Sequence, residues 1–144
     1  DTDRDSKVET GEKTEVSIRG LHILLAEDNE LNMEIAEFIL RNEGAEVTKA
    51  WNGQEAVELF RKSEPGEFDV ILIDIMMPVM NGYEATKMIR SLDREDAKAI
   101  PIIAMTANAF TEDRIRAKEA GMNEHVAKPV DVKLLVQVIH KLVG

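Results

Sequence analysis

The sequence contains no cysteine, and this absence excludes several kinds of site. Disulfide bonds, zinc sites built from thiolates and cysteine nucleophiles all require this residue. The absence fits a reducing compartment, so we expect the chain to work in the cytoplasm. This expectation also holds if the parent protein is anchored in a membrane. Because the first residue is Asp1 rather than methionine, we further expect the chain to be part of a longer protein.

Positive charge is also scarce. The 144 residues include 18 Lys and Arg against 28 Asp and Glu, which gives a net charge of −10. Nucleic-acid binding needs a cationic surface to displace counterions from phosphates, and anionic membranes attract the same kind of surface. We therefore expect no nucleic-acid partner and no direct membrane contact. No uncharged apolar run approaches the roughly 18 residues of a membrane-spanning helix, and the N-terminus does not resemble a signal peptide.

Residues 1–20 differ in composition from the rest of the chain. They carry six acidic and four basic residues, and their only large apolar residues are Val8, Val16 and Ile18. Such a segment buries too little apolar surface to offset the entropy lost on ordering. We therefore expect a charged linker or disordered tail over 1–20 and a single domain over 21–144. Hydrophobic residues make up 44% of the chain, which is enough for one core.

From residue 21 onward, short apolar runs alternate with segments of helical periodicity. The runs at 21–26, 45–50, 68–73, 100–105 and 124–127 predict buried strands. Leu31, Ile35, Phe38 and Ile39 recur at helical spacing, and Gly44 ends that helix. Further helices are predicted after position 52 and over 83–92, 109–120 and 132–142. Five strand–helix units in series predict an α/β fold of the flavodoxin-like doubly wound type, a five-stranded parallel sheet of order 2-1-3-4-5.

Two Asn-Gly pairs, at 52–53 and 81–82, ordinarily indicate β-hairpins. Each pair is followed here by a segment of helical period, so we interpret both as strand-to-helix connections. Asn52 with Glu55 three residues later fits a helix-capping box, and Asp131 is the expected cap of the last helix.

Polar residues collect where the predicted strands end. Glu27 and Asp28 follow the first strand, Asp74 the third, Thr106 the fourth and Lys128 the fifth. In the expected strand order the first and third strands are neighbours, so three carboxylates meet in one crevice at the carboxyl ends of the strands. Such carboxylates stay ionised only beside a cation, and ligands that are all oxygen favour Mg²⁺ or Mn²⁺. These groups suit the attack of a carboxylate on a phosphoryl group, which gives an aspartyl phosphate.

At these positions the chain closely resembles the receiver domain of two-component response regulators and hybrid histidine kinases. The resemblance covers residues 20–144 and is carried by ILLAEDNELN (23–32), ILIDIMMPVMNGYEATKMIR (71–90), PIIAMTANAF (101–110) and HVAKPVD (125–131). It implies a magnesium-dependent phosphorelay in which a phosphohistidine-bearing kinase or phosphotransfer domain phosphorylates Asp74. The phosphorylated domain would then switch a protein partner or its parent kinase. Phosphorylation and dephosphorylation would be catalysed by the domain itself.

The resemblance also implies a role for each site residue. Asp74 would be the phosphoacceptor, Lys128 would neutralise the phosphoryl oxygens, and Thr106 would move toward the phosphoryl group. The metal would be held by Glu27, Asp28, Asp74 and the backbone carbonyl of Met76, while Pro78, Gly82 and Pro129 would shape the loops. Two residues depart from the family pattern: Glu27 replaces an aspartate, and His125 replaces the switch aromatic. The simpler interpretation of His125 is a partly exposed strand-end residue, and the alternative is a switch that also titrates.

Several alternatives are weighed against this function. We expect the C-terminal receiver of a hybrid sensor histidine kinase, because the chain ends directly after the last predicted helix; the alternative is a stand-alone single-domain response regulator. An enzyme of the haloacid dehalogenase type needs an aspartate at position 76, which is Met76 here. A flavin carrier needs a phosphate-binding cradle, whereas acids follow the first strand. A receiver that serves only for docking is disfavoured by the presence of the site residues. A weak homodimer stays open, as do the stimulus and the cognate donor.

Overall fold

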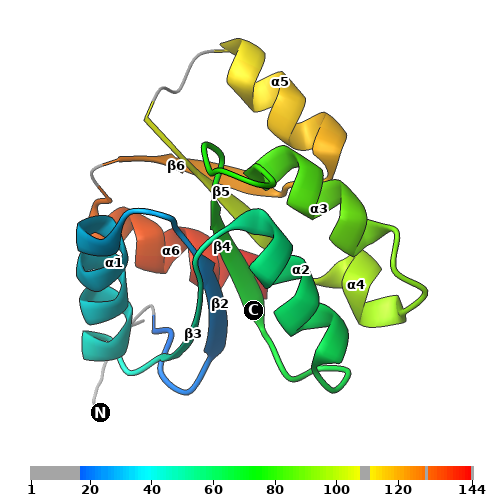
Figure 1. The fold of residues 1–144 in the computed structure, drawn as a ribbon. Coiled ribbons are helices and arrows are strands. Elements are labelled where there is room, and N and C mark those ends of the chain that lie inside the picture. Colours follow the sequence, from blue (N-terminus) through cyan, green and yellow to red (C-terminus); the bar gives the residue numbers. More distant parts are fainter. Residues whose placement is uncertain (1–16, 108–110, 129, 144) are drawn as a thin grey trace.

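Five parallel strands form the centre of the molecule (Figure 1). The computed structural model describes residues 17–107, 111–128 and 130–143. The strands are β2 (His22–Ala26), β3 (Glu46–Ala50), β4 (Val70–Asp74), β5 (Ile102–Thr106) and β6 (Glu124–Ala127). They are parallel throughout and lie in the order β3-β2-β4-β5-β6. In order of sequence this is 2-1-3-4-5, which confirms the predicted flavodoxin-like doubly wound fold.

Helices cover both faces of this sheet (Figure 1). They are α1 (Glu30–Asn42), α2 (Gly53–Lys62), α3 (Gly82–Arg90), α4 (Glu95–Ala99), α5 (Thr111–Ala120) and α6 (Val132–Val143). Because successive side chains of a strand point to opposite faces, Ile23 and Leu25 pack in one core with α1 and α6. Leu24 and Ala26 pack in a second core with the other helices. None of the described helices is both long enough and apolar enough to cross a membrane.

The predicted caps Asn52 and Asp131 are present, but the capping box expected at Asn52 is incomplete, because the Glu55 carboxylate accepts from the Trp51 amide at 2.8 Å rather than from the Asn52 amide. The Oδ1 atom of Asn52 accepts a hydrogen bond from the Glu55 amide at 2.8 Å, and Oδ1 of Asp131 accepts one from the Leu134 amide at 3.1 Å. Both Asn-Gly pairs begin helices, as expected, because each asparagine is an N-cap and each glycine is the first helical residue.

The buried face of α1 differs from the apolar spacing seen in the sequence. Leu31, Ile35 and Phe38 are exposed to 64%, 50% and 70%, whereas the helix buries its Met33, Ala36 and Leu40 face against the sheet. Both sets recur at helical spacing, so periodicity correctly predicts the helix but cannot select its inner face. The exposed set forms an apolar stripe on the outside of α1.

Two further features were not expected from the sequence. The short helix α4 has the sequence EDAKA, which lacks apolar periodicity, and only its Ala97 is buried. Ile18, expected in the tail, is 1% exposed and belongs to the core beside α6. Its carbonyl accepts a hydrogen bond from the Leu21 amide at 3.1 Å. Residues 17–20 therefore pack on the domain, while residues 1–16 lie outside the described residues.

Candidate functional site

Three carboxylates meet at the carboxyl ends of β2 and β4. Glu27, Asp28 and Asp74 each offer an oxygen, and these oxygens lie within 4.8 Å of one another. The two strands are hydrogen-bonded neighbours, so the residues that end them lie side by side. Glu27 and Asp74 are buried, at 1% and 3% exposure, whereas Asp28 is exposed. The structure thus brings together the three acids that the sequence places after separate strands.

Lys128, which directly follows the edge strand β6, reaches this cluster with its side chain. Its Nζ atom lies 2.9 Å from Oδ2 of Asp74 and 3.1 Å from Oε1 of Glu27. The Lys128 amide donates to the Thr106 carbonyl at 2.8 Å, which continues the pairing of β6 with β5 and aims the side chain at the crevice. Burial opposes the charge of this ammonium, but its hydrogen bonds to Asp74 and Glu27 outweigh burial and hold the pKa of Lys128 above its ordinary value.

Backbone amides orient the two buried carboxylates. The Asn29 amide donates to Oε2 of Glu27 at 3.0 Å, and the Met76 amide donates to Oδ1 of Asp74 at 3.3 Å. Asn29 is also the N-cap of α1, since its side chain accepts from the Asn32 amide at 2.9 Å. Asn29 was not among the predicted site residues, although an asparagine directly before the first residue of a helix is a typical N-cap.

The two expected switch residues lie on neighbouring strands. Thr106 ends β5 and is buried at 7% exposure, and His125 lies half-buried on β6, opposite Ala104. His125 also lines a groove of about 210 Å³ between β6 and α5, together with Arg114 and Lys118 of that helix. The switch roles themselves stay predictions, and Pro129 lies outside the described residues.

The loop after Asp74 is tightly wound. Val79 has φ of 70°, a left-handed conformation that is strained for a β-branched residue. It is the centre of a narrow turn in which the Met80 amide donates to the Pro78 carbonyl at 2.7 Å. The Gly82 amide then donates to the Ile75 carbonyl at 2.9 Å and closes the loop. Pro78 and Gly82 thus stand at a turn and at a closure, the kind of position that the resemblance implied for them.

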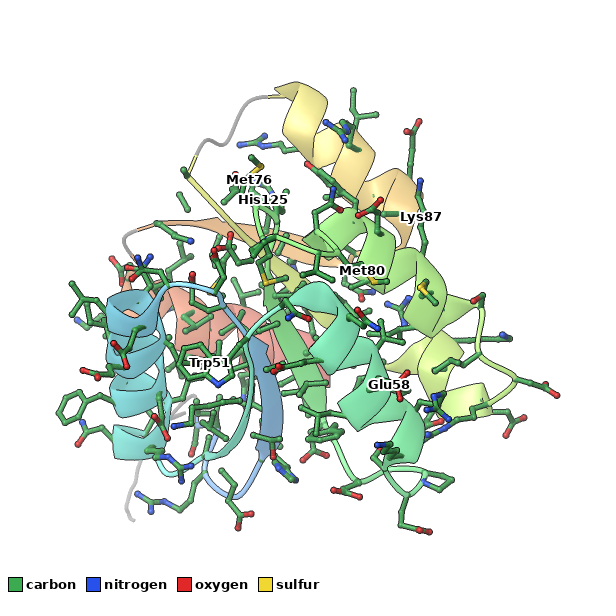
Figure 2. The ribbon with its side chains drawn as sticks, in the orientation of Figure 1. Trp51, Glu58, Met76, Met80, Lys87 and His125 are labelled. Carbon is green, nitrogen blue, oxygen red and sulfur yellow. The ribbon has the colours of Figure 1, made fainter. Side chains whose placement is uncertain are left out.

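The loop after Asp74 carries two exposed apolar side chains. Met76 and Val79 are each 75% exposed. In the view of Figure 2, Met76 and His125 both project toward the end of the molecule where α5 lies. The phosphoacceptor candidate is therefore buried itself, while the loop that follows it exposes apolar groups.

The donor set of the crevice fits a hard divalent cation. Its ligand atoms are carboxylate oxygens, which Mg²⁺ and Mn²⁺ prefer over softer ligands. Among the described residues, the three carboxylates outnumber the ammonium group of Lys128, which contacts Glu27 and Asp74, so the cluster has room for more positive charge. Glu27, Asp28 and Asp74 are the side chains that would hold the ion.

Known families and proteins resemble this chain over most of its length. The family described as the response regulator receiver domain matches residues 23–140. Hybrid signal transduction histidine kinase M of Dictyostelium discoideum is 44% identical over 122 residues, which are 84% of this chain but 5% of that protein. The polar-differentiation response regulator DivK of Brucella anthropi is 34% identical over 122 residues, 85% of this chain and 95% of DivK. The chain thus spans a small part of the kinase and nearly all of DivK.

Two solved structures show the same fold. The receiver domain of the sensor histidine kinase PA1611 from Pseudomonas aeruginosa superposes with a TM-score of 0.78 at 39% identity, over 87% of this chain and 98% of that one. That structure holds a magnesium ion in its active site cleft. The complex of the histidine phosphotransfer protein Ypd1 with the receiver domain of Ssk1, from Saccharomyces cerevisiae, matches with a TM-score of 0.75 at 29% identity, over 87% of this chain and 90% of the matched chain.

Proposed function

The chain belongs to the response regulator receiver domain family, and from this premise we propose that the carboxylate of Asp74 accepts a phosphoryl group from a phosphohistidine. As a receiver domain it takes part in two-component phosphorelay signalling. The observation that supports the acceptor most directly is the contact of Lys128 Nζ with Oδ2 of Asp74 at 2.9 Å inside an acidic cluster. A lone surface carboxylate would have neither the burial nor the partner.

Each residue of the crevice has a distinct task in this reaction. An oxygen of Asp74 forms a bond to phosphorus as the bond from phosphorus to the donor imidazole nitrogen breaks, and the imidazole leaves with the electron pair. Lys128, held protonated, neutralises phosphoryl oxygens, and the hydroxyl of Thr106 stands at the end of the adjacent strand to contact them. A bound Mg²⁺ or Mn²⁺ supplies further positive charge. Glu27 and Asp28 hold that ion beside Asp74.

The exposed stripe of α1, formed by Leu31, Ile35 and Phe38, is the surface we propose for the donor protein. It is continuous with the site, because Ile35 lines a small cavity together with Glu27 and Lys128. Ssk1, a receiver domain of related fold, was crystallised with a histidine phosphotransfer protein. An apolar stripe beside a reactive carboxylate suits a partner that must dock before the phosphoryl group can transfer.

The parent protein is proposed to be a hybrid histidine kinase in the cytoplasm, with residues 1–16 as a linker. The kinase of Dictyostelium discoideum is more similar to this chain than DivK is, at 44% against 34% identity. This favours a kinase-linked receiver over a stand-alone regulator.

Intact mass spectrometry after incubation with acetyl phosphate and Mg²⁺ tests the acceptor. We expect one phosphoryl adduct, which disappears in Asp74→Asn and in the presence of EDTA. Asp69→Asn is the matched control. Oδ2 of Asp69 accepts a hydrogen bond from the His22 amide at 2.8 Å, and Asp69 lies before β4 rather than at its carboxyl end. An adduct that persists in Asp74→Asn would reject Asp74 as the acceptor. Repeated turnover of an aryl phosphate would instead indicate a phosphatase.

A further inference from the structure

The two Asn-Gly pairs do more than start helices. Asn52 caps α2 and Asn81 caps α3, and each accepts from the amide three residues later, Glu55 at 2.8 Å and Glu84 at 2.9 Å. In each case the following glycine is the first residue of the helix. The matching geometry leaves the amides of Gly53 and Gly82 to bond outside their own helices.

Gly82 holds the start of the loop that follows the phosphoacceptor. Its amide donates to the Ile75 carbonyl at 2.9 Å. A Cβ atom at this position would lie 2.6 Å from the carbonyl oxygen of Asp74. Only a glycine allows the first turn of α3 to lie this close to the backbone of Asp74.

Gly53 holds the end of the same loop, although it comes from a different strand–helix unit. Its amide donates to the Met80 carbonyl at 3.0 Å. A Cβ atom here would lie 2.2 Å from that oxygen and 2.9 Å from the Met80 carbonyl carbon, whereas ordinary contacts are 3.4–4 Å. Figure 2 shows Met80 between α2 and α3, where the two helices begin. The atoms that would collide are backbone atoms, which cannot turn aside as a side chain can.

We propose that Gly53 is a positioning residue for phosphorylation of Asp74, which it serves by fixing the Met80 end of the loop. This inference rests on the proposed function. Between the bonds made by Gly82 and Gly53, the loop contains the strained turn at Val79 and the Met76 amide that orients Asp74. Strained backbone persists only where its surroundings hold it, and these two bonds supply that restraint.

Helix formation and backbone conformation do not by themselves require glycine at position 53. Gly53 does not have the positive φ found at Gly20, Gly44, Gly66 and Gly121. In a helix, glycine is less favourable than alanine, because it loses more backbone entropy. The close approach to Met80 is therefore the physical reason for a glycine here.

Gly53→Ala tests the proposal. The methyl group must push the Met80 carbonyl away by about 1 Å, and misplacement of that size can lower a rate as much as 100-fold. We expect a Mg²⁺ dissociation constant raised about fivefold or more by calorimetry. At saturating Mg²⁺, we expect the initial rate of phosphorylation by acetyl phosphate to fall about tenfold or more.

Val57→Ala is the control for a purely structural effect. Val57 lies on the same helix, is 4% exposed and packs in the core with the sheet. Its truncation destabilises α2 without adding atoms near Met80. Under conditions where urea titration shows both variants fully folded, we expect the Mg²⁺ affinity and phosphorylation rate of Val57→Ala to match wild type. Equal losses in the two variants would overturn the positioning role.

A measurement on the wild-type chain covers the case in which Gly53→Ala does not fold. In an NMR titration with Mg²⁺, we expect the Gly53 amide resonance to shift with the same midpoint as that of Met76. The Gly66 amide, which donates to Asp96, is expected to stay unchanged. A Gly53 resonance that does not respond would overturn the proposal. Equal phosphorylation rates in wild type and Gly53→Ala would also overturn the proposal. If the wild-type chain is not phosphorylated at all, the proposed function itself is rejected.

Discussion

The carboxyl and amino ends of the sheet use charged side chains in different ways. At the carboxyl end, Lys128 is shared by Asp74 and Glu27, and a third carboxylate lies beside them. Near the amino end, Arg94 precedes α4 and lies against the last turn of α2. Its guanidinium makes two parallel hydrogen bonds to Asp96 at 2.9 and 2.7 Å. The first cluster has more negative than positive groups, whereas the second is a matched ion pair.

Arg94 and Asp96, which we call the arginine cluster, also lie at the end of α2, where Arg94 bonds to backbone carbonyls. The Nη1 atom of Arg94 donates to the carbonyls of Phe60, Arg61 and Ser63 at 2.8–3.2 Å, and its guanidinium lies 4.7 Å from the centre of the Phe60 ring. These carbonyls lie at the C-terminal end of α2, where the regular helical hydrogen bonds stop. Arginine suits this task because its planar group presents five donors in fixed directions.

Arg90 fills a similar role at the C-terminal end of α5. It donates to the carbonyl of Gly121 at 2.8 and 3.0 Å and to the carbonyl of Ala97 at 3.0 Å. Burial lowers the pKa of Arg90, although arginine remains charged at any ordinary pH. At the amino end, matched donors and acceptors stabilise the fold, whereas the surplus of carboxylates at the carboxyl end fits the binding of a cation.

The largest expected effect comes from removing the cation of the site. Lys128→Met should lower the initial rate of phosphorylation by acetyl phosphate about 100-fold or more, because one charge that stabilises the phosphoryl oxygens is lost. The rate is followed by intact mass at saturating Mg²⁺. Lys133→Met, an exposed change on α6, is expected to keep the wild-type rate. A rate for Lys128→Met within threefold of wild type would contradict the role.

Breaking the arginine cluster should affect stability but not function. Arg94→Ala removes an ion pair and several hydrogen bonds to carbonyls, so we expect the free energy of unfolding in urea to fall by about 2–3 kcal/mol. The phosphorylation rate of the folded variant should stay within twofold of wild type. Arg61→Ala, which breaks an exposed pair with Glu58, should cost less than about 1 kcal/mol. A much lower phosphorylation rate in folded Arg94→Ala would contradict the view that the amino end of the sheet serves stability alone.

A smaller effect is expected at Thr86, whose buried hydroxyl has no hydrogen-bond partner within the described part of the chain. Thr86→Val should raise the free energy of unfolding by about 1 kcal/mol, since an unpaired buried hydroxyl is removed. Thr48→Val is the comparison variant, because the Thr48 hydroxyl does have a partner: its Oγ1 lies 2.7 Å from Nε2 of His22. It should lower stability by about the same amount. Equal changes in the two variants would contradict this interpretation.

The smallest effects are expected from pH, and they should separate the two ends. The folded pKa of Lys128 lies above the ordinary 10.5, so its contribution to stability is present below that pH and is lost as pH rises through the folded value. The pKa of Asp96 is lowered from 3.8 chiefly by Arg94, so its contribution is present above 3.8 and is lost as pH falls through the folded value. Urea titrations across pH should show the alkaline loss disappear in Lys128→Met and the acid loss disappear in Asp96→Asn. Unchanged profiles would reject these assignments.

Much of the fold follows from local sequence. The apolar runs predict all five strands, and the two Asn-Gly pairs and Asp131 mark three helix starts that the structure shows. Glu27, Asp28, Asp74, Thr106 and Lys128 could be found because each follows or ends a strand. Parallel strands bring their carboxyl ends to one edge, so the order of the strands converts five separate positions into one site.

What the sequence alone determined is therefore the fold class, the strand order and the residues of the crevice. Only the tertiary structure decided which stripe of α1 is buried, because two stripes satisfy the same helical period. It also placed Ile18 in the core, since burial of one residue in a polar segment depends on distant partners. The contact of Gly53 with Met80 is of the same kind. A glycine offers no side chain to predict from, and its importance arises only when two backbones from different units approach each other.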